Sequence, residues 1–186
     1  MRKTLAALMA LTALSLTAAP RPALAENPMV GGAPMFADRT IVENAVNSAD
    51  HTTLVAAVQA AGLVEALQGP GPFTVFAPVN AAFDALPAGT VETLLKPENK
   101  PALTKVLTAH VVAGKLSGAE LMAQARRARD GYVHLSTLSG DALSVTLRGK
   151  RLYVVDESGN AAEVTIADVN QSNGVIHVVN RVLLPK

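Results

Sequence analysis

The chain of 186 residues is 49% hydrophobic and 17% charged, and its formal net charge at pH 7 is +1. It contains no cysteine, which excludes disulfides, thiol nucleophiles and thiolate-bound metals. A chain so close to neutrality also lacks the positive excess with which proteins hold nucleic acid, so we expect no nucleic-acid partner.

The N-terminus has the pattern of an export signal. Arg2 and Lys3 precede an apolar run at residues 5–19, and a small-x-small cleavage pattern ends at Ala25. The run is shorter than the roughly 20 residues of a membrane-spanning helix, which argues against an uncleaved anchor. We predict a signal peptide at residues 1–25, cleaved after Ala25, and a protein that is secreted or periplasmic. Cleavage would remove three basic residues and leave a formal net charge of −2.

The remaining chain is interpreted as a leader followed by one domain. Residues 26–39 carry two prolines and two adjacent glycines with little periodicity, which predicts a flexible leader. Residues 40–186 are long enough to form a core without disulfides, and we expect them to fold as one monomeric domain. No second apolar run has the length of a membrane span, so none is expected in the mature chain.

Helical patterns dominate the first half of this domain. Apolar residues recur at helical spacing between residues 41 and 67. The elements expected after them, in order, are a strand at 73–77, a short helix from Asn80, helix over 90–108 with an interruption near Pro97, a strand at 111–112 and a helix opened by a capping box at Ser117 and Glu120.

The second half has the period of two that is typical of half-buried strands. Strands are expected at residues 132–137, 143–148, 151–155, 162–169 and 175–184, with a two-residue hairpin turn at Gly149 and Lys150. Helices followed by antiparallel strands indicate an α+β fold.

A search for catalytic, metal and cofactor motifs finds none. No metalloprotease, nucleophile-elbow, phosphate-loop or dinucleotide pattern is present, and His51, His110, His134 and His177 each stand alone. We therefore expect no cofactor, no metal site and no catalytic residues. A hydrolase remains an alternative only if His110, His177 and a carboxylate meet in one cleft.

Three arginines form a small basic cluster at residues 126, 127 and 129. They fall at the C-terminal end of a predicted helix, where cations complement the macrodipole. We prefer this interpretation to the alternative of an anion-binding patch.

Two dense segments carry a family resemblance. The first, residues 74–83, reads TVFAPVNAAF and joins a strand to a helix, where Asn80 can cap that helix or bond across to a neighbouring turn. The second, residues 173–185, reads NGVIHVVNRVLLP, and Asn173 and Gly174 predict a turn with a positive φ. With the segment AHVVAGKL at residues 109–116 between them, they resemble the ordered motifs of the fasciclin domain family over about residues 40–186. Ala109 stands where the family has a tyrosine, and Asn180 where it has an aspartate.

The resemblance implies a β wedge of antiparallel strands with several helices packed beside it. It also implies an exported protein of adhesion and matrix interactions, to which no catalytic activity is generally attached. An Asp-Ile pair of animal relatives contacts integrins, and the matching positions here are Asp168 and Val169. Four polar residues of the motifs, Asn80, His110, Asn173 and His177, are expected to form a structural network between them.

Two functional hypotheses follow from the sequence and its resemblance. The first is an exported interaction module that supports cell adhesion or attachment to a surface or matrix, with a protein or polysaccharide partner. The alternative is a periplasmic or extracellular carrier of a small apolar or saccharide ligand, held in a crevice of an alanine-rich core.

Overall fold

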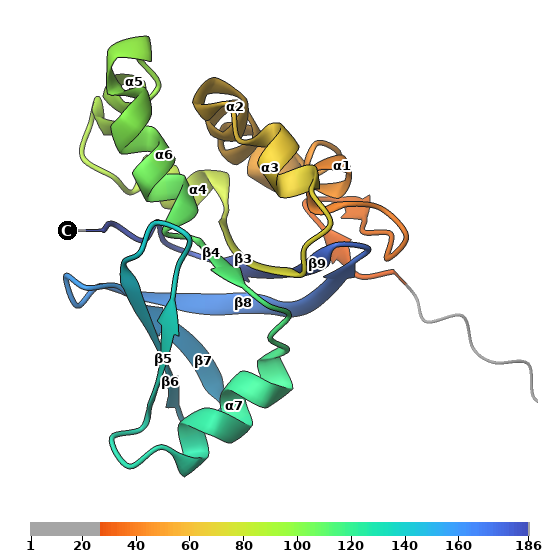
Figure 1. Ribbon diagram of the computed structural model, residues 1–186, viewed down its shortest axis with the longest axis vertical. Coiled ribbons are helices and arrows are strands. Elements are labelled where there is room, and N and C mark those ends of the chain that lie inside the picture. The colour runs from red at the N-terminus through yellow and green to blue at the C-terminus, as the bar shows by residue number, and fades with distance from the viewer. Residues whose placement is uncertain (1–26, 186) are drawn as a thin grey trace, which may run out of the picture.

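A computed structural model describes residues 27–185 as one seven-stranded sheet with helices at its two ends (Figure 1). The predicted signal peptide therefore lies outside the described residues. The helices of the first half are α1 (Ile41–Ala45), α2 (Thr52–Ala61), α3 (Val64–Gln68), α4 (Asn80–Asp84), α5 (Thr90–Leu94) and α6 (Lys100–Thr108), with short 3-10 helices η1 (Ala49–His51) and η2 (Pro97–Asn99). The helix α7 (Gly118–Arg127) packs alone at the other end.

The sheet has the strand order β4-β3-β9-β8-β7-β6-β5. Its strands are β3 (Phe73–Pro78), β4 (Val111–Ala113), β5 (Tyr132–Ser136), β6 (Ala142–Arg148), β7 (Arg151–Val155), β8 (Ala161–Gln171) and β9 (Gly174–Val179). All neighbours are antiparallel except β3 and β9, which run parallel. The expected α+β wedge of mostly antiparallel strands is confirmed.

The long strand β8 joins the two halves of the wedge. Its pairing with β9 shifts register between Val164 and Ile166 and again between Ile166 and Val169. Bulges of this kind bend a strand and increase its twist. The bend allows β8 to pair with β9 near one end and with β7 near the other.

Two apolar cores lie on opposite sides of the central strands β3 and β9. Val75, Ala77 and Ile176 face the core beneath α1–α6, whereas Phe76 and Val179 face the core beneath α7. The side chains of a strand alternate between its two faces, so each central strand contributes to both cores. This explains why β9 is buried along its whole length.

The segment expected to be a leader differs from that expectation. Met29–Val30 and Ala33–Pro34 pair as a small hairpin, β1 and β2, around Gly31 and Gly32, which both have positive φ. Val30 and Met35 are buried in the core. Glycines that suggested flexibility instead supply the turn, because a two-residue hairpin loop needs positive φ at both positions.

The hairpin is attached to the domain through a buried amide. Asn44 of α1 accepts a hydrogen bond from the main-chain N–H of Phe36 at 3.0 Å and donates to its carbonyl at 2.7 Å. The Asn44 amide also donates to Gln171 at the end of β8. Residues 28–36 are thus part of the domain rather than a spacer before it.

Other expectations hold with small differences in length. Ser117 caps α7 in a complete capping box with Glu120, and Arg148 pairs with Arg151 across the predicted two-residue turn. The last strand ends at Val179 instead of reaching residue 184. Beyond it, Val182 and Leu183 are still buried, so the apolar pattern reflects a packed tail instead of a longer strand. None of the helices within residues 27–185 has the length and apolarity needed to traverse a bilayer.

Candidate functional site

Asn80 at the end of the first motif bonds across to a neighbouring helix. Its Oδ1 accepts from the main-chain N–H of Thr53 at 3.1 Å and from the Thr52 hydroxyl at 3.2 Å. Its Nδ2 donates to the Ala49 carbonyl at 2.8 Å. His51, the N-cap residue of α2, makes no capping hydrogen bond with its side chain. Asn80 therefore satisfies one of the main-chain donors that a helix N-terminus leaves open, the Thr53 N–H.

His110 connects the end of α6 to the C-terminal tail. Its Nδ1 lies 2.8 Å from the Val106 carbonyl, and its Nε2 accepts from the main-chain N–H of Leu183 at 2.9 Å. These partners define a neutral ring with the proton on Nδ1. Burial lowers the pKa of His110 to about 4, against smaller opposing effects from the Val106 carbonyl and from Asp156.

Asn173 and Gly174 bring the beginnings of β3 and β9 together. The Asn173 amide donates to the Leu67 carbonyl at 2.7 Å, and its Oδ1 accepts from the main-chain N–H of Ile41 at 3.1 Å. Gly174 does not have the positive φ that the sequence predicted. Instead, a Cβ at this position would overlap the Phe73 carbonyl oxygen, so the glycine is required by close approach of two main chains.

His177 lies inside the wedge, where it stacks on Phe76 with ring centroids 5.6 Å apart. Its Nε2 is 2.8 Å from the Leu116 carbonyl, and its Nδ1 accepts from the main-chain N–H of Asp168 at 3.2 Å. Burial lowers its pKa, which the Leu116 carbonyl and the Asp168 charge partly oppose. The ring is therefore a neutral bridge between two main-chain segments.

Asp168 and Val169 occupy the bend of β8. Asp168 has φ of 60°, and its Oδ1 accepts from the main-chain N–H of Gly118, the first residue of α7, at 2.7 Å. The Asp168 side chain is partly exposed, whereas Val169 is buried. The bend and the start of α7 are thus held together by one carboxylate.

The four motif residues do not hydrogen-bond to one another. Asn80, His110, Asn173 and His177 each join a different pair of segments, mostly through main-chain groups. Both ring nitrogens of His110 and of His177 are engaged, which leaves neither ring free for acid–base chemistry. Within residues 27–185, no three histidine or carboxylate side chains gather as metal ligands would.

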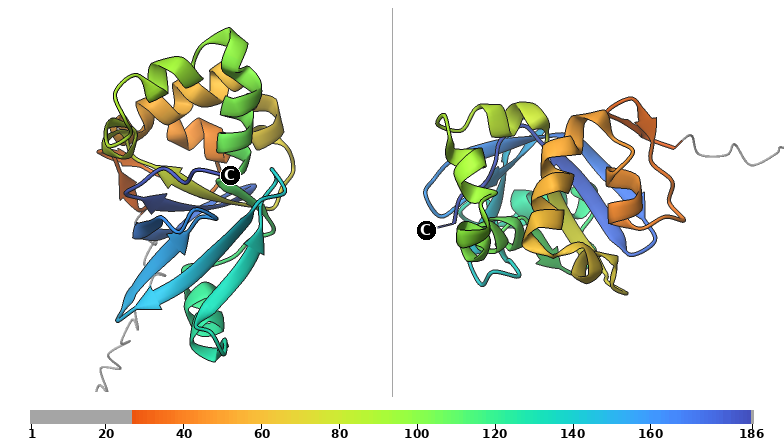
Figure 2. Two further views of the ribbon diagram at one scale, coloured as in Figure 1. Left: turned by 90° about the vertical axis from the view of Figure 1, so that its left-hand side faces the viewer. Right: turned by 90° about the horizontal axis from the view of Figure 1, so that it is seen from above.

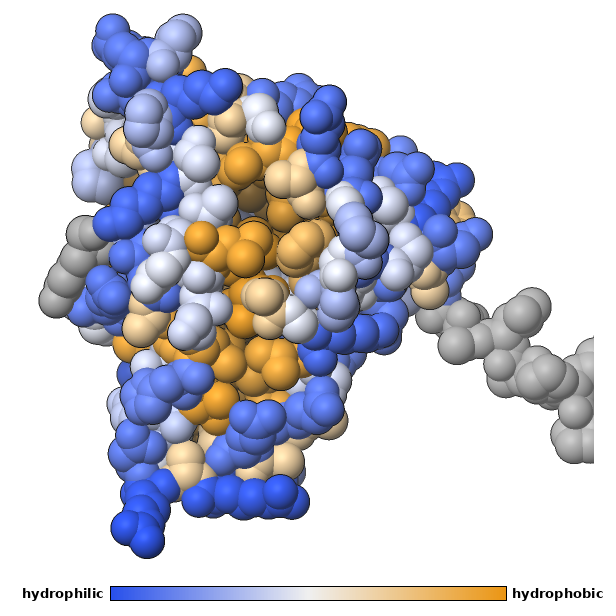
Figure 3. All heavy atoms as spheres, in the orientation of Figure 1, coloured by the Kyte–Doolittle hydropathy of each residue, from blue (hydrophilic) through white to orange (hydrophobic). Residues whose placement is uncertain are grey.

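An apolar pocket lies under the helices, where the carrier hypothesis expected a crevice, although the sequence did not identify its lining residues. It has a volume of about 80 Å³, and Val58, Leu67, Leu107 and Ile176 are among its lining residues. Figure 3 shows the hollowed apolar strip between the α2–α3 side and the α4–α6 side of the helical layer. An enclosed water needs only about 10–15 Å³ of such space, so the pocket has room for several ligand atoms.

His51 is the polar side chain of interest in this pocket. It is 3% exposed, and its Nδ1 lies 2.8 Å from the Ser48 hydroxyl. Its Nε2 is buried and has no hydrogen-bond partner among the described residues. Burial lowers the pKa of His51, partly offset by the Ala77 carbonyl and the Asp50 charge, so the ring is neutral near pH 7. No periodicity or motif in the sequence distinguishes His51 from the other histidines.

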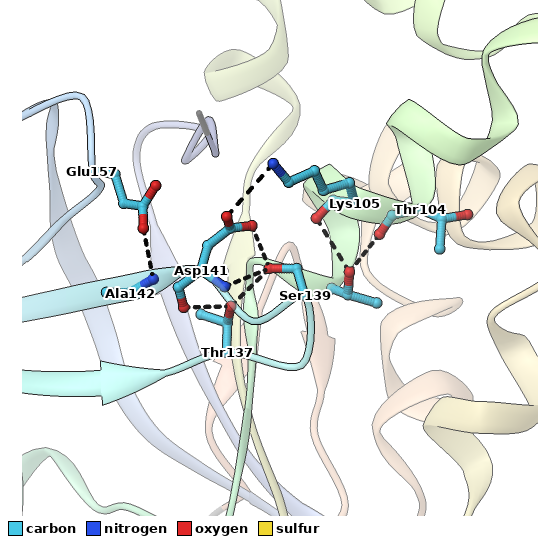
Figure 4. A network of polar contacts seen from close by, with 8 residues as sticks. Thr104, Lys105, Thr137, Ser139, Asp141, Ala142 and Glu157 are labelled. Carbon is cyan, nitrogen blue, oxygen red and sulfur yellow. Dashed lines mark hydrogen bonds and ion pairs between the residues drawn. The ribbon is translucent and has the colours of Figure 1, made fainter.

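The hairpin turn between β5 and β6 forms part of the pocket wall through Leu138. A network of polar contacts fixes this turn (Figure 4): the Thr137 and Ser139 hydroxyls lie 2.8 Å apart, and Ser139 donates to Asp141 at 2.7 Å. Asp141 in turn forms an ion pair with Lys105 of α6 at 3.5 Å. The network therefore joins the two halves of the wedge beside the pocket.

The comparison with known families decides the assignment. The fasciclin domain model matches residues 49–185. The chain belongs to the fasciclin domain family. The motif residues described above therefore lie within a fasciclin domain, and Ala109, at the position where the family has a tyrosine, is buried.

Relatives of known sequence and structure agree with this assignment. Protein sll1483 of a Synechocystis species is 46% identical over 191 residues, which cover 98% of each chain. The cell surface glycolipoprotein MPB83 of Mycobacterium bovis is 35% identical over 127 residues, covering 66% of this chain and 48% of that one. The solved structure of a FAS1 domain pair from the insect cell adhesion molecule fasciclin I has a TM-score of 0.68 at 18% identity, over 78% of this chain and 51% of that chain. That likeness shows the fold.

Proposed function

We propose that this protein is an exported interaction module that supports attachment of cells to a surface or matrix. The observation that carries the proposal is membership of the fasciclin family, in which one relative is a cell surface protein and one fold neighbour is part of a cell adhesion molecule. Export rests on the predicted signal peptide at residues 1–25.

The arrangement of the motif residues is consistent with such a module. His110, His177 and Asn173 are buried and bonded within the domain, so they stabilise the wedge without presenting a contact surface. Of the pair at the β8 bend, Val169 is buried, and a partner could be contacted only through Asp168. Asp168 is therefore our candidate contact residue at this position.

The test is deletion of the gene, scored for attachment of the cells to surfaces and to one another, with rescue by purified protein. We expect attachment to fall on deletion and to recover when wild-type protein is added. Asp168→Asn retains an oxygen that can accept from the Gly118 N–H but removes the negative charge. It therefore tests the contribution of that charge to attachment without removing the contact that holds the start of α7. Unchanged attachment in the deletion strain would contradict the proposal.

A second candidate, a carrier of a small apolar ligand, is favoured by the pocket containing His51. An apolar chain with one polar end would place its body against Val58 and Leu107 and its polar end at Nε2 of His51. Native mass spectrometry of protein purified from its source should then show a reproducible adduct. His51→Phe keeps the wall apolar but removes Nε2, and it should reduce adduct occupancy. An adduct-free wild-type protein would rule the carrier out.

A further inference from the structure

The outer face of the strands β5–β8 is a polar surface that none of the motifs includes. Strand register places Tyr132, Thr146, Tyr153 and Glu163 side by side across the four strands. They alternate with core residues such as Val133, Val145, Val154 and Ala162, which face α7. Figure 2 shows α7 on one side of these strands, and Tyr132, His134, Arg148 and Arg151 are exposed on the other.

This face contains both tyrosines of the chain. Tyr132 is 39% exposed and lies beside His134, with ring centroids 6.5 Å apart. The guanidinium of Arg148 lies over the Tyr153 ring, 4.9 Å from its centroid. The exposed ring of Tyr132 offers an apolar face with a polar group at its edge, which suits the mixed surface of a sugar ring.

Positive charge is concentrated at the end of the wedge where α7, which packs on the other side of the strands, leads into β5. Six exposed cations lie on the last turn of α7, the loop that follows it and the β6–β7 hairpin: Arg126, Arg127, Arg129, Arg148, Lys150 and Arg151. Two carboxylates, Asp130 and Glu163, accompany them. The rest of the chain has 10 basic and 13 acidic residues, so this end carries the opposite sign to the remainder.

The helix dipole accounts for Arg126 and Arg127, which lie in the last turn of α7 as predicted, but neither it nor ion pairing accounts for the remaining cations. Arg129 lies beyond the end of α7, and Arg148 and Lys150 belong to the hairpin. Of the six cations, only Arg151 forms an ion pair within residues 27–185, with Glu163 at 3.0 Å. Arg126, Arg127, Arg129 and Lys150 are exposed to a ligand. Arg148, which lies over the Tyr153 ring, is on the same strand face as the exposed ring of Tyr132, because Tyr132 pairs with Thr146, two residues before Arg148.

We propose that this end of the wedge, formed by the exposed ring of Tyr132 and the six cations, binds an acidic polysaccharide. Its arginines and lysine would contact carboxylate or sulfate groups, while Tyr132 stacks on a sugar ring. Charge complementarity favours a polyanion, and the exposed aromatic ring favours a glycan over a lipid surface. A repeating ligand also suits a single domain, because many domains can occupy one chain and gain avidity. The proposal rests on the attachment function and names its partner class.

The experiment measures binding of the purified full-length protein to polygalacturonate, with neutral dextran as the reference. We expect binding to polygalacturonate that weakens as salt rises, since exposed charges are screened. Arg127→Gln with Lys150→Gln should weaken it about fivefold, from the typical strength of two exposed charge contacts. Lys96→Gln with Lys100→Gln, exposed cations on the opposite helical layer, makes the same change in net charge and should leave binding unchanged.

The aromatic contribution is tested separately at Tyr132. Tyr132→Ala should weaken binding several-fold and reduce the part that persists at high salt, whereas Tyr132→Phe should keep it because the ring remains. Thermal unfolding of each variant checks that the fold is intact. These side chains are exposed, so their substitution should leave the melting temperature unchanged.

Three results would overturn the proposal. The first is equal weakening by the Arg127–Lys150 and the Lys96–Lys100 double variants. The second is absence of polygalacturonate binding by the wild type, and the third is equal affinity for phosphatidylglycerol vesicles, which would indicate a membrane partner. If the wild type rescues attachment but does not bind polygalacturonate, the polysaccharide inference fails while the attachment function stands. If it neither rescues nor binds, both fail.

Discussion

Acidification should destabilise the protein through His110, and the effect can be worked out from its surroundings. The ring is neutral in the folded state because burial lowers its pKa to about 4. In the unfolded chain a histidine has a pKa near 6.5, so the unfolded state binds more protons between these two values. The stabilising contribution of the neutral ring is therefore fully present above about pH 6.5 and is lost as pH falls toward 4.

The size of this effect between pH 7 and pH 5 is about 2 kcal/mol. The pKa values of His177 and His51 are lowered in the same direction, so both add to the loss of stability on acidification. Urea unfolding at pH 7 and pH 5 measures the difference. His110→Gln should reduce this difference in stability, because the ring that gains a proton on unfolding is then absent. Equal wild-type stability at the two pH values, or the same loss in His110→Gln, would refute the reasoning.

Two further substitutions test the motif residues. Asn80→Ala removes the acceptor for the Thr53 N–H and should cost about 1 kcal/mol, as loss of a helix cap does. The melting temperature should then fall by about 2–4 °C. An unchanged melting temperature would show that water replaces the Asn80 oxygen as acceptor. Gly174→Ala places a methyl group against the Phe73 carbonyl and should cost about 3 kcal/mol in urea unfolding, and a loss below about 0.5 kcal/mol would contradict the close approach.

Local patterns were sufficient for most of the elements. Ser117 and Glu120 define the start of α7 because a capping box involves only four consecutive residues. The strands β6 and β7 follow from their alternation and from a turn that fits two residues. In each case the contacts that determine the element join residues close together in the sequence, so a short stretch of sequence is enough to predict it.

Where the sequence was insufficient, distant residues decide. Gly174 is needed because Phe73 approaches it, and Asn80 caps a helix that precedes it in the chain. The hairpin at residues 29–34 is fixed by Asn44, and the importance of His51 depends on a pocket assembled from several elements. None of these relations has a signature within a short window of sequence.

The parallel pairing of β3 with β9 has a consequence for how the chain folds. β3 precedes its partner β9 in the chain by five other strands and most of the helices of the domain. Contacts between distant segments form slowly, because a long loop must close before any of them stabilises the structure. Both cores depend on this pairing, so a chain that stops short of β9 leaves Phe76 and Val75 uncovered at once. Both halves of the wedge therefore acquire their shared central strand only after the chain has been synthesised through β9.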